Sequence, residues 1–162
     1  SFEAITLIKG GSGYGTALFI NRLASAGTGN LVEFQYNGSG VGNINTNGST
    51  VTYNPQSDYR LKQDISNITD ATTKIKSLRP VNYRWKNNTS VGYDTGFLAH
   101  EVQETGYFNQ SVTGVKDGTK TKYDDPSTTE PDYQGLDYSK FTPMLVAAFQ
   151  ELEARVTALE SS

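Results

Sequence analysis

The chain has 162 residues, which fits one ordinary domain or two small ones. With 17 acidic residues against 14 Lys and Arg it is mildly acidic, which argues against nucleic acid as its main partner. Having no cysteine and only one histidine, His100, it excludes disulfides, thiol catalysis and a His-rich metal site, and we expect no cofactor.

No apolar run approaches the roughly 18 residues of a membrane span, so we expect no membrane partner. No signal peptide pattern opens the chain, and its abrupt start is typical of a piece of a longer protein. Hydrophobic residues make up 35% and glycine is frequent, with 16 copies. A chain this polar buries little apolar surface alone, and oligomerisation is expected to supply the missing core.

Residues 1–56 carry few charges and alternate between short apolar bursts and Gly-rich breakers. The bursts are Ala4–Ile8, Ala17–Ile20, Leu31–Tyr36 and Val51–Tyr53; the breakers are residues 10–13, 27–29, 37–40 and 47–49. This pattern predicts short strands with Asn-Gly turns. The strands are too few and too short for a core of their own, which favours intertwined chains in a fibrous β-stem. Gly11–Gly15 superficially resembles a phosphate-binding loop but lacks the Lys-Ser/Thr and the following helix, so we predict a turn.

Residues 57–137 carry more charge and predict a small globular part. A short helix is expected over Asp70–Leu78, capped by Thr69 or Asp70 and ended by Pro80. Its apolar face consists of Ala71, Ile75 and Leu78.

The next elements are two strands and a helix. Val81–Lys86 alternates like a strand with Val81, Tyr83 and Trp85 inward, and Asn87-Asn88 forms the turn. A short strand over Asp94–Ala99 and a helix over His100–Thr105, stopped by Gly106, follow. Residues 111–135 are polar and predict an arm that lies on something else, with its hairpin tip at Asp117-Gly118.

The C-terminal stretch, residues 138–162, has apolar residues spaced 4, 3, 4 and 3 apart: Leu145, Phe149, Leu152, Val156 and Leu159. This is heptad spacing, with Arg155 and Glu160 placed for an interhelical ion pair, and it favours a coiled coil, dimeric or trimeric. The alternative is a single amphipathic helix packed on its own domain.

The border between the first two segments contains a possible nucleophile and base, Ser57 and Lys62. A lysine can replace histidine as the base for a serine hydroxyl when burial disfavours its charged form. The spacing alone is weak, since Ser57 and Asp58 equally fit an ordinary turn followed by a solvated lysine.

Four stretches in order carry a family resemblance: SDYRLKQDI, LRPVNYRW, GFLAHEVQE and YQGLDYSKFTPMLVAAFQELEARVTALE. They resemble the C-terminal intramolecular chaperone domain of phage tail spikes, tail fibres and endosialidases, the self-cleaving peptidase S74 family. The similarity covers roughly residues 54–160.

The resemblance implies an α+β homotrimer. Residues 1–57 would be the end of an intertwined, β-helix-like fibre stem, the folding client. Residues 58–162 would be the chaperone, a small mixed α/β part with an extended hairpin arm and, over residues 138–162, a three-helix coiled coil.

The resemblance also implies a single-turnover serine peptidase that cuts its own chain between Ser57 and Asp58 with a Ser57–Lys62 dyad. Assembly would occur in the host cytoplasm; the stem would stay on the virion tail and the chaperone would be released. His100 stands where relatives often have another polar residue, so we assign it a structural role.

Two alternatives from other classes stay open. One is a trimerisation and folding module without cleavage, and the other is a carbohydrate-binding fibre tip that uses Tyr and Trp. A free-standing protease is disfavoured because nothing in the sequence indicates a substrate groove. The carbonyl that Ser57 attacks, and whether Lys62 acts within or between chains, are open as well.

Overall fold

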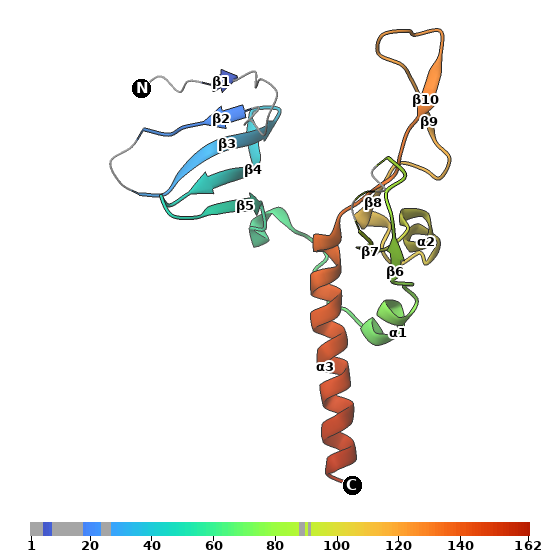
Figure 1. Ribbon diagram of the computed structural model, residues 1–162. Coiled ribbons are helices and arrows are strands. Elements are labelled where there is room, and N and C mark those ends of the chain that lie inside the picture. Colours follow the sequence, from blue (N-terminus) through green and yellow to red (C-terminus); the bar gives the residue numbers. More distant parts are fainter. Residues whose placement is uncertain (1–4, 8–17, 24–26, 88–89, 91) are drawn as a thin grey trace. The chain divides into compact units, whose positions relative to one another are not determined.

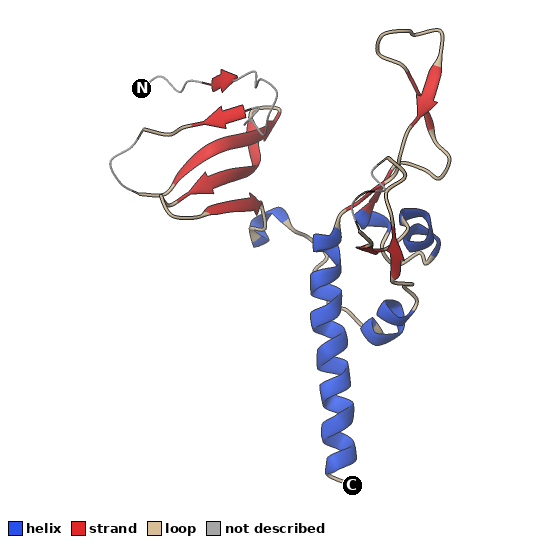
Figure 2. Ribbon diagram, viewed as in Figure 1, coloured by secondary structure: helices blue, strands red, loops and turns tan. Residues whose placement is uncertain are grey.

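The computed structural model describes residues 5–7, 18–23, 27–87, 90 and 92–162. The chain divides into two compact units, Ser1–Ile65 and Ser66–Ser162. It is a mixed α/β protein with several small antiparallel sheets and one long C-terminal helix (Figures 1 and 2). The mixed class predicted from the sequence is confirmed at this level.

The first unit consists of strands joined by tight turns. Strand β1 (Ile5–Leu7) pairs with β2 (Leu18–Ile20), while β3 (Gly29–Tyr36), β4 (Ser39–Thr46) and β5 (Val51–Pro55) form a three-stranded sheet in the order β3-β4-β5. The sequence did not predict β4, because its Gly, Ser and Asn residues are typical of a breaker. The expected turn at Gly11–Gly15 lies outside the described residues.

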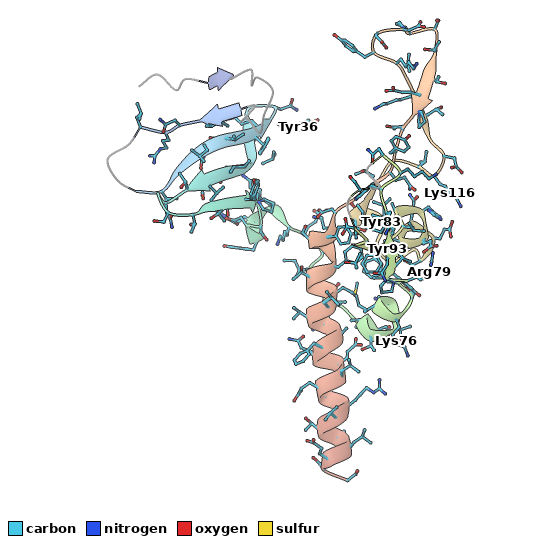
Figure 3. The ribbon with its side chains drawn as sticks, viewed as in Figure 1. Tyr36, Lys76, Arg79, Tyr83, Tyr93 and Lys116 are labelled. Carbon is cyan, nitrogen blue, oxygen red and sulfur yellow. The ribbon has the colours of Figure 1, made fainter. Side chains whose placement is uncertain are left out.

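The turn between β3 and β4 is the predicted Asn-Gly hairpin. Asn37 and Gly38 have φ of 50° and 79°, and positive φ at both central residues is the signature of a type I′ turn. The sheet has no buried core, since no residue in the range 27–65 is buried. Tyr36, at the end of β3, leaves 72% of its surface exposed (Figure 3).

The second unit holds the core of the described chain. Its helices and strands begin with α1 (Ala71–Lys76), β6 (Val81–Tyr83), β7 (Asp94–Gly96) and α2 (Ala99–Glu104). Val102, Phe108 and Phe141 are buried together, and partly buried side chains pack around them: Ile75, Leu78, Phe97, Val112, Leu136 and Met144. The predicted apolar face of this segment is confirmed: on α1, Ala71 is fully buried and Ile75 packs against the core, and Leu78, which follows the end of the helix, packs there too.

The cap of α1 differs from the prediction. Asp70 stands at the N-cap, but its φ of 55° is left-handed and its side chain makes no capping hydrogen bond. The carboxylate of Glu151, from the C-terminal helix, instead accepts hydrogen bonds from the backbone N–H groups of Ala71 (2.7 Å) and Thr72 (2.8 Å) and from the Thr72 hydroxyl (2.7 Å). These bonds, those from Thr72 foremost, lower the pKa of Glu151.

The strand predicted over Val81–Lys86 is shorter than expected, and the inward position of Trp85 is wrong. Strand β6 ends at Tyr83, and Trp85 lies beyond it with 56% of its surface exposed. It packs edge-on against the Tyr83 ring at 5.2 Å and donates its indole N–H to Asp94 at 3.4 Å. The strand ends two residues before Trp85, and the chain then turns at residues 86–87; Asn88 lies outside the described residues.

The polar arm is a two-step hairpin. Strand β8 (Val112–Thr113), which follows the 3-10 turn η2 (Asn109–Ser111), pairs with β11 (Gly135–Leu136). Farther out, β9 (Thr119–Thr121) pairs with β10 (Thr129–Pro131), as Figure 1 shows. The predicted tip at Asp117-Gly118 is wrong. The backbone of Asp117 is left-handed, as in a turn, but the Gly118 carbonyl accepts a hydrogen bond from the Asp132 backbone N–H across the arm. The hairpin therefore continues beyond this point, and its tip is residues 122–128.

The predicted C-terminal helix is confirmed as α3 (Phe141–Glu160), which follows the 3-10 turn η3 (Tyr138–Lys140). Its buried residues are Phe141 and Ala148. The heptad residues are on other parts of its surface, with these exposed fractions: Leu145 52%, Phe149 70%, Leu152 46%, Val156 52% and Leu159 75%. The stripe is therefore not what packs α3 on its own unit, and the coiled coil stays a prediction.

Candidate functional site

The candidate site lies just after the three-stranded sheet, entirely within the first unit. After β5 the backbone N–H of Gln56 donates to the Val41 carbonyl at 3.3 Å, which is the last backbone bond to the sheet. The chain then enters the 3-10 turn η1 (Tyr59–Leu61), with Asp58 as its N-cap and Lys62 as its C-cap. A single tight turn therefore separates the candidate nucleophile from the candidate base.

This turn brings Ser57 and Lys62 into contact. The Lys62 ammonium nitrogen donates to the Ser57 hydroxyl oxygen at 2.8 Å, within the range expected for a nucleophile and its base. Because a 3-10 turn advances only about 2 Å per residue, side chains on either side of it can meet across five positions. Both residues are exposed in the single chain, so nothing here removes Lys62 from water.

Asp58, on the other side of the expected scissile bond, has a different partner. Its two carboxylate oxygens accept hydrogen bonds from the Arg60 side chain at 3.0 and 2.7 Å, and one of them also accepts the Arg60 backbone N–H at 2.9 Å. The side-chain bond and then the backbone bond from Arg60 lower the pKa of Asp58, while Asp58 raises the pKa of Arg60.

The contacts between Asp58 and Arg60 limit the chemical roles that these two side chains can have in cleavage. An Asp58 carboxylate held ionised by Arg60 is an acceptor at neutral pH and not a proton donor. The Arg60 fork is occupied by Asp58, so in this arrangement it is not the free donor that an oxyanion requires. The groups left for proton transfer at the turn are the Ser57 hydroxyl and the Lys62 amine.

The other candidate residues lie elsewhere in the chain. His100 is on α2, in the second unit, where it helps to line an open hollow of about 690 Å³ at the base of the arm together with Lys116, Asp132 and Tyr133. A second, apolar hollow lies on the β3–β5 sheet, and neither hollow includes Ser57 or Lys62. Within the described ranges no group of acidic or histidine side chains could hold a metal ion, and no helix is long and apolar enough to cross a membrane.

Two stabilising contacts were not predicted from the sequence. The Arg60–Asp58 pair was not assigned a structural role, although an acidic residue two positions before an arginine at the start of a turn is a visible signal. Glu151 was also missed as a helix cap, for which no local signal exists.

The fold and the turn together define a mixed α/β protein with a Ser–Lys pair at the end of a small β-sheet. A comparison with protein families gives this class a name: residues 57–113 match the family Peptidase_S74, chaperone of endosialidase. The match begins at Ser57 and includes Lys62. It agrees with the family resemblance of the sequence motifs over this segment of the chain. A search of curated proteins found no match.

Proposed function

We propose that the chain is an intramolecular chaperone that trimerises, folds the phage fibre or spike segment preceding it, and then releases itself by cutting between Ser57 and Asp58. The observation that carries the proposal is the 2.8 Å contact between Lys62 and Ser57, because it stands at the position where the family match begins. In this proposal Ser57 is the nucleophile and Lys62 the base.

The overall reaction is hydrolysis of one peptide bond. One water is consumed, Ser57 gains a carboxylate and Asp58 gains an amino group. Lys62 takes the Ser57 hydroxyl proton, which requires the neutral amine; the 2.8 Å between Nζ and Oγ is short enough for that transfer once the direction of the hydrogen bond is reversed. Attack on the Ser57 carbonyl passes through a strained four-membered ring. Attack on the Gln56 carbonyl passes through an easier five-membered ring but would break the Gln56–Ser57 bond, before Ser57 instead of after it. Attack by the serine of a neighbouring chain and attack by an activated water are the other routes.

Assembly gives the reaction its timing. In the single chain Lys62 is exposed to solvent, so the turn alone does not supply the dry environment in which a lysine acts as a base. Packing of neighbouring copies against the turn would exclude water and favour the neutral amine. Cleavage would then follow correct assembly, and the stem left behind would persist kinetically because its folding device is gone.

The exposed apolar surface supports an assembling protein. Large hydrophobic side chains are exposed beside the candidate dyad, with Tyr59 75%, Leu61 67% and Ile65 75% accessible. The α3 heptad stripe is similarly exposed. Exposed apolar residues gathered this way mark interaction surfaces, whereas singly scattered ones do not. Three chains held in register also raise the effective concentration of their stems, which shortens the search for interchain pairing.

The experiment is expression of the full chain with Ser57→Ala or Lys62→Ala, followed by a denaturing gel and mass spectrometry. Wild type is expected to give a fragment that begins at Asp58, and each variant is expected to stay intact. Ser66→Ala and Lys86→Ala are matched controls, since they remove an exposed hydroxyl and an exposed amine outside the dyad, and both are expected to be cut. Normal cutting in either dyad variant would refute the mechanism, and an intact wild type with a stable trimer would favour the folding module without cleavage.

A further inference from the structure

The turn between Ser57 and Lys62 contains a strong interaction between Arg60 and Asp58. Arg60 binds Asp58 through three hydrogen bonds, two from its guanidinium and one from its own backbone N–H. A guanidinium on both oxygens of one carboxylate fixes the plane of each group, which a single-point contact does not. The backbone bond adds an N-cap to the same carboxylate.

This clamp fixes the backbone on which the dyad depends. With Asp58 locked as the cap, its carbonyl accepts the Leu61 N–H at 3.1 Å and the Tyr59 carbonyl accepts the Lys62 N–H at 3.1 Å. These two bonds set the direction in which Lys62 leaves the turn. An isolated single turn of 3-10 helix has little stability of its own, so its geometry depends on the cap.

The clamp also decides which partner Lys62 has. Asp58 is the carboxylate nearest in sequence to the dyad, and an unclamped carboxylate at this place could pair with the Lys62 ammonium. Such an ion pair would favour the charged form and occupy the donor. With Asp58 bound by Arg60, Lys62 donates its hydrogen bond to Ser57.

We propose that Arg60 is a positioning residue for self-cleavage: by clamping Asp58 it holds the turn that places Lys62 on Ser57 and keeps the Asp58 carboxylate from competing for Lys62. This role rests on the proposed function and adds to it a residue that acts through others and touches no reacting atom. Both effects require a planar, two-pronged cation, so lysine at position 60 is a poor substitute.

The test measures the rate of self-cleavage of the full chain after refolding, for wild type, Arg60→Ala and Arg60→Lys. Loss of the clamp is expected to slow cleavage roughly ten- to a hundredfold, the range in which small misplacements of reacting groups act. Arg60→Lys is expected to recover little of it. Ethylguanidinium added to Arg60→Ala is expected to restore part of the rate, because it supplies the missing fork to Asp58.

Arg79→Ala is the matched control. Arg79 also binds a carboxylate with a two-pronged guanidinium, that of Glu101, but both residues of this pair belong to the second unit. It is expected to cleave at the wild-type rate and not to respond to ethylguanidinium. Sedimentation of each variant shows whether assembly is unchanged.

The outcomes separate this inference from the proposed function. If Ser57→Ala blocks cleavage and Arg60→Ala cleaves like wild type, the positioning role is wrong and the dyad stands. If Arg60→Ala is slow but ethylguanidinium does not help and Arg79→Ala is equally slow, arginine at position 60 serves only general stability and the inference is overturned. If Ser57→Ala itself cleaves normally, the proposed function fails first.

Discussion

Two phenylalanines on one helix provide a sharp test of how α3 is used. Phe141, in its first turn, is 5% exposed, whereas Phe149, two turns later, is 70% exposed. The Phe141 ring lies 5.0 Å from Phe108, 5.4 Å from Phe97 and 6.0 Å from Tyr138, measured between ring centres. The first phenylalanine therefore belongs to the core, and the second belongs to the heptad stripe.

The two substitutions should differ greatly in the free energy of unfolding of a single chain. Removing a buried phenylalanine ring costs about 3–5 kcal/mol, and contacts with neighbouring rings bring the value toward the upper end. Phe149→Ala loses almost no burial within one chain and is expected to change the unfolding free energy by less than about 0.5 kcal/mol. The ratio of unfolding constants between the two variants is then on the order of a hundredfold or more.

The assay is urea unfolding followed by circular dichroism over a range of protein concentrations, with sedimentation to count chains. Phe141→Ala is expected to lower the midpoint at every concentration. Phe149→Ala is expected to leave the midpoint of the dilute protein unchanged and to abolish its rise with concentration, because the stability of an assembly depends on mass action. Equal losses for both variants in dilute protein would show that the assignment of the helix faces is wrong.

Two further predictions concern packing in the second unit. Because hydrogen bonding lowers the pKa of Glu151 below that of an unfolded glutamate, its stabilisation is present at neutral pH and is lost as pH falls through the lowered value. Glu151→Gln is expected to be less stable than wild type at pH 7 and to lose less stability on acidification, as measured by urea midpoints at several pH values. Glu153→Gln is the control, and its urea midpoints should depend on pH as those of wild type do. Parallel curves of midpoint against pH for all three proteins would contradict the role of Glu151 as the cap of α1. A Cβ at Gly96 would collide with the hydroxyl of Tyr138, and one at Gly92 meets open space. Gly96→Ala should therefore cost about 1–3 kcal/mol by thermal unfolding and Gly92→Ala close to nothing, and a harmless Gly96→Ala would mean that Tyr138 is not held where the structure has it.

The features that sequence predicted best are those decided by neighbouring residues. The Asn37-Gly38 hairpin follows from two residues that tolerate positive φ, and the end of α2 follows from Gly106, whose φ is 76°. The helix over the heptads is similarly local, since its spacing lies within one segment. These elements depend little on the rest of the chain.

The features that it missed are decided at a distance. Strand β4 exists because it lies between β3 and β5 and bonds to both, not because Gly and Asn favour strands. The cap of α1 comes from a residue 80 positions away, Glu151, which no window along the chain can contain. Trp85 fits an alternating pattern, but the strand ends at Tyr83, before Trp85 is reached.

The candidate site lies between these cases. The spacing of Ser57 and Lys62 is compatible with an ordinary turn, and the family motifs rather than the spacing singled the pair out. Their 2.8 Å contact requires a 3-10 turn capped by Asp58, and that turn in turn involves Arg60. The sequence motifs singled out Ser57, Asp58 and Lys62 but not the support that they receive from Arg60.

The far end of α3 carries a consequence for how order spreads along the chain. From Leu152 to its last residue every position of α3 is exposed, so this stretch gains little burial from its own unit. Helices of fewer than about 12 residues are marginal in water when nothing packs on them. One copy of the chain therefore ends in a segment that it maintains poorly alone, and burial by other copies would turn it into a rigid rod. Under the proposed assembly, the helicity of this last stretch of α3 is expected to rise with the number of copies that associate. This stretch is far along the sequence from the bond to be cut.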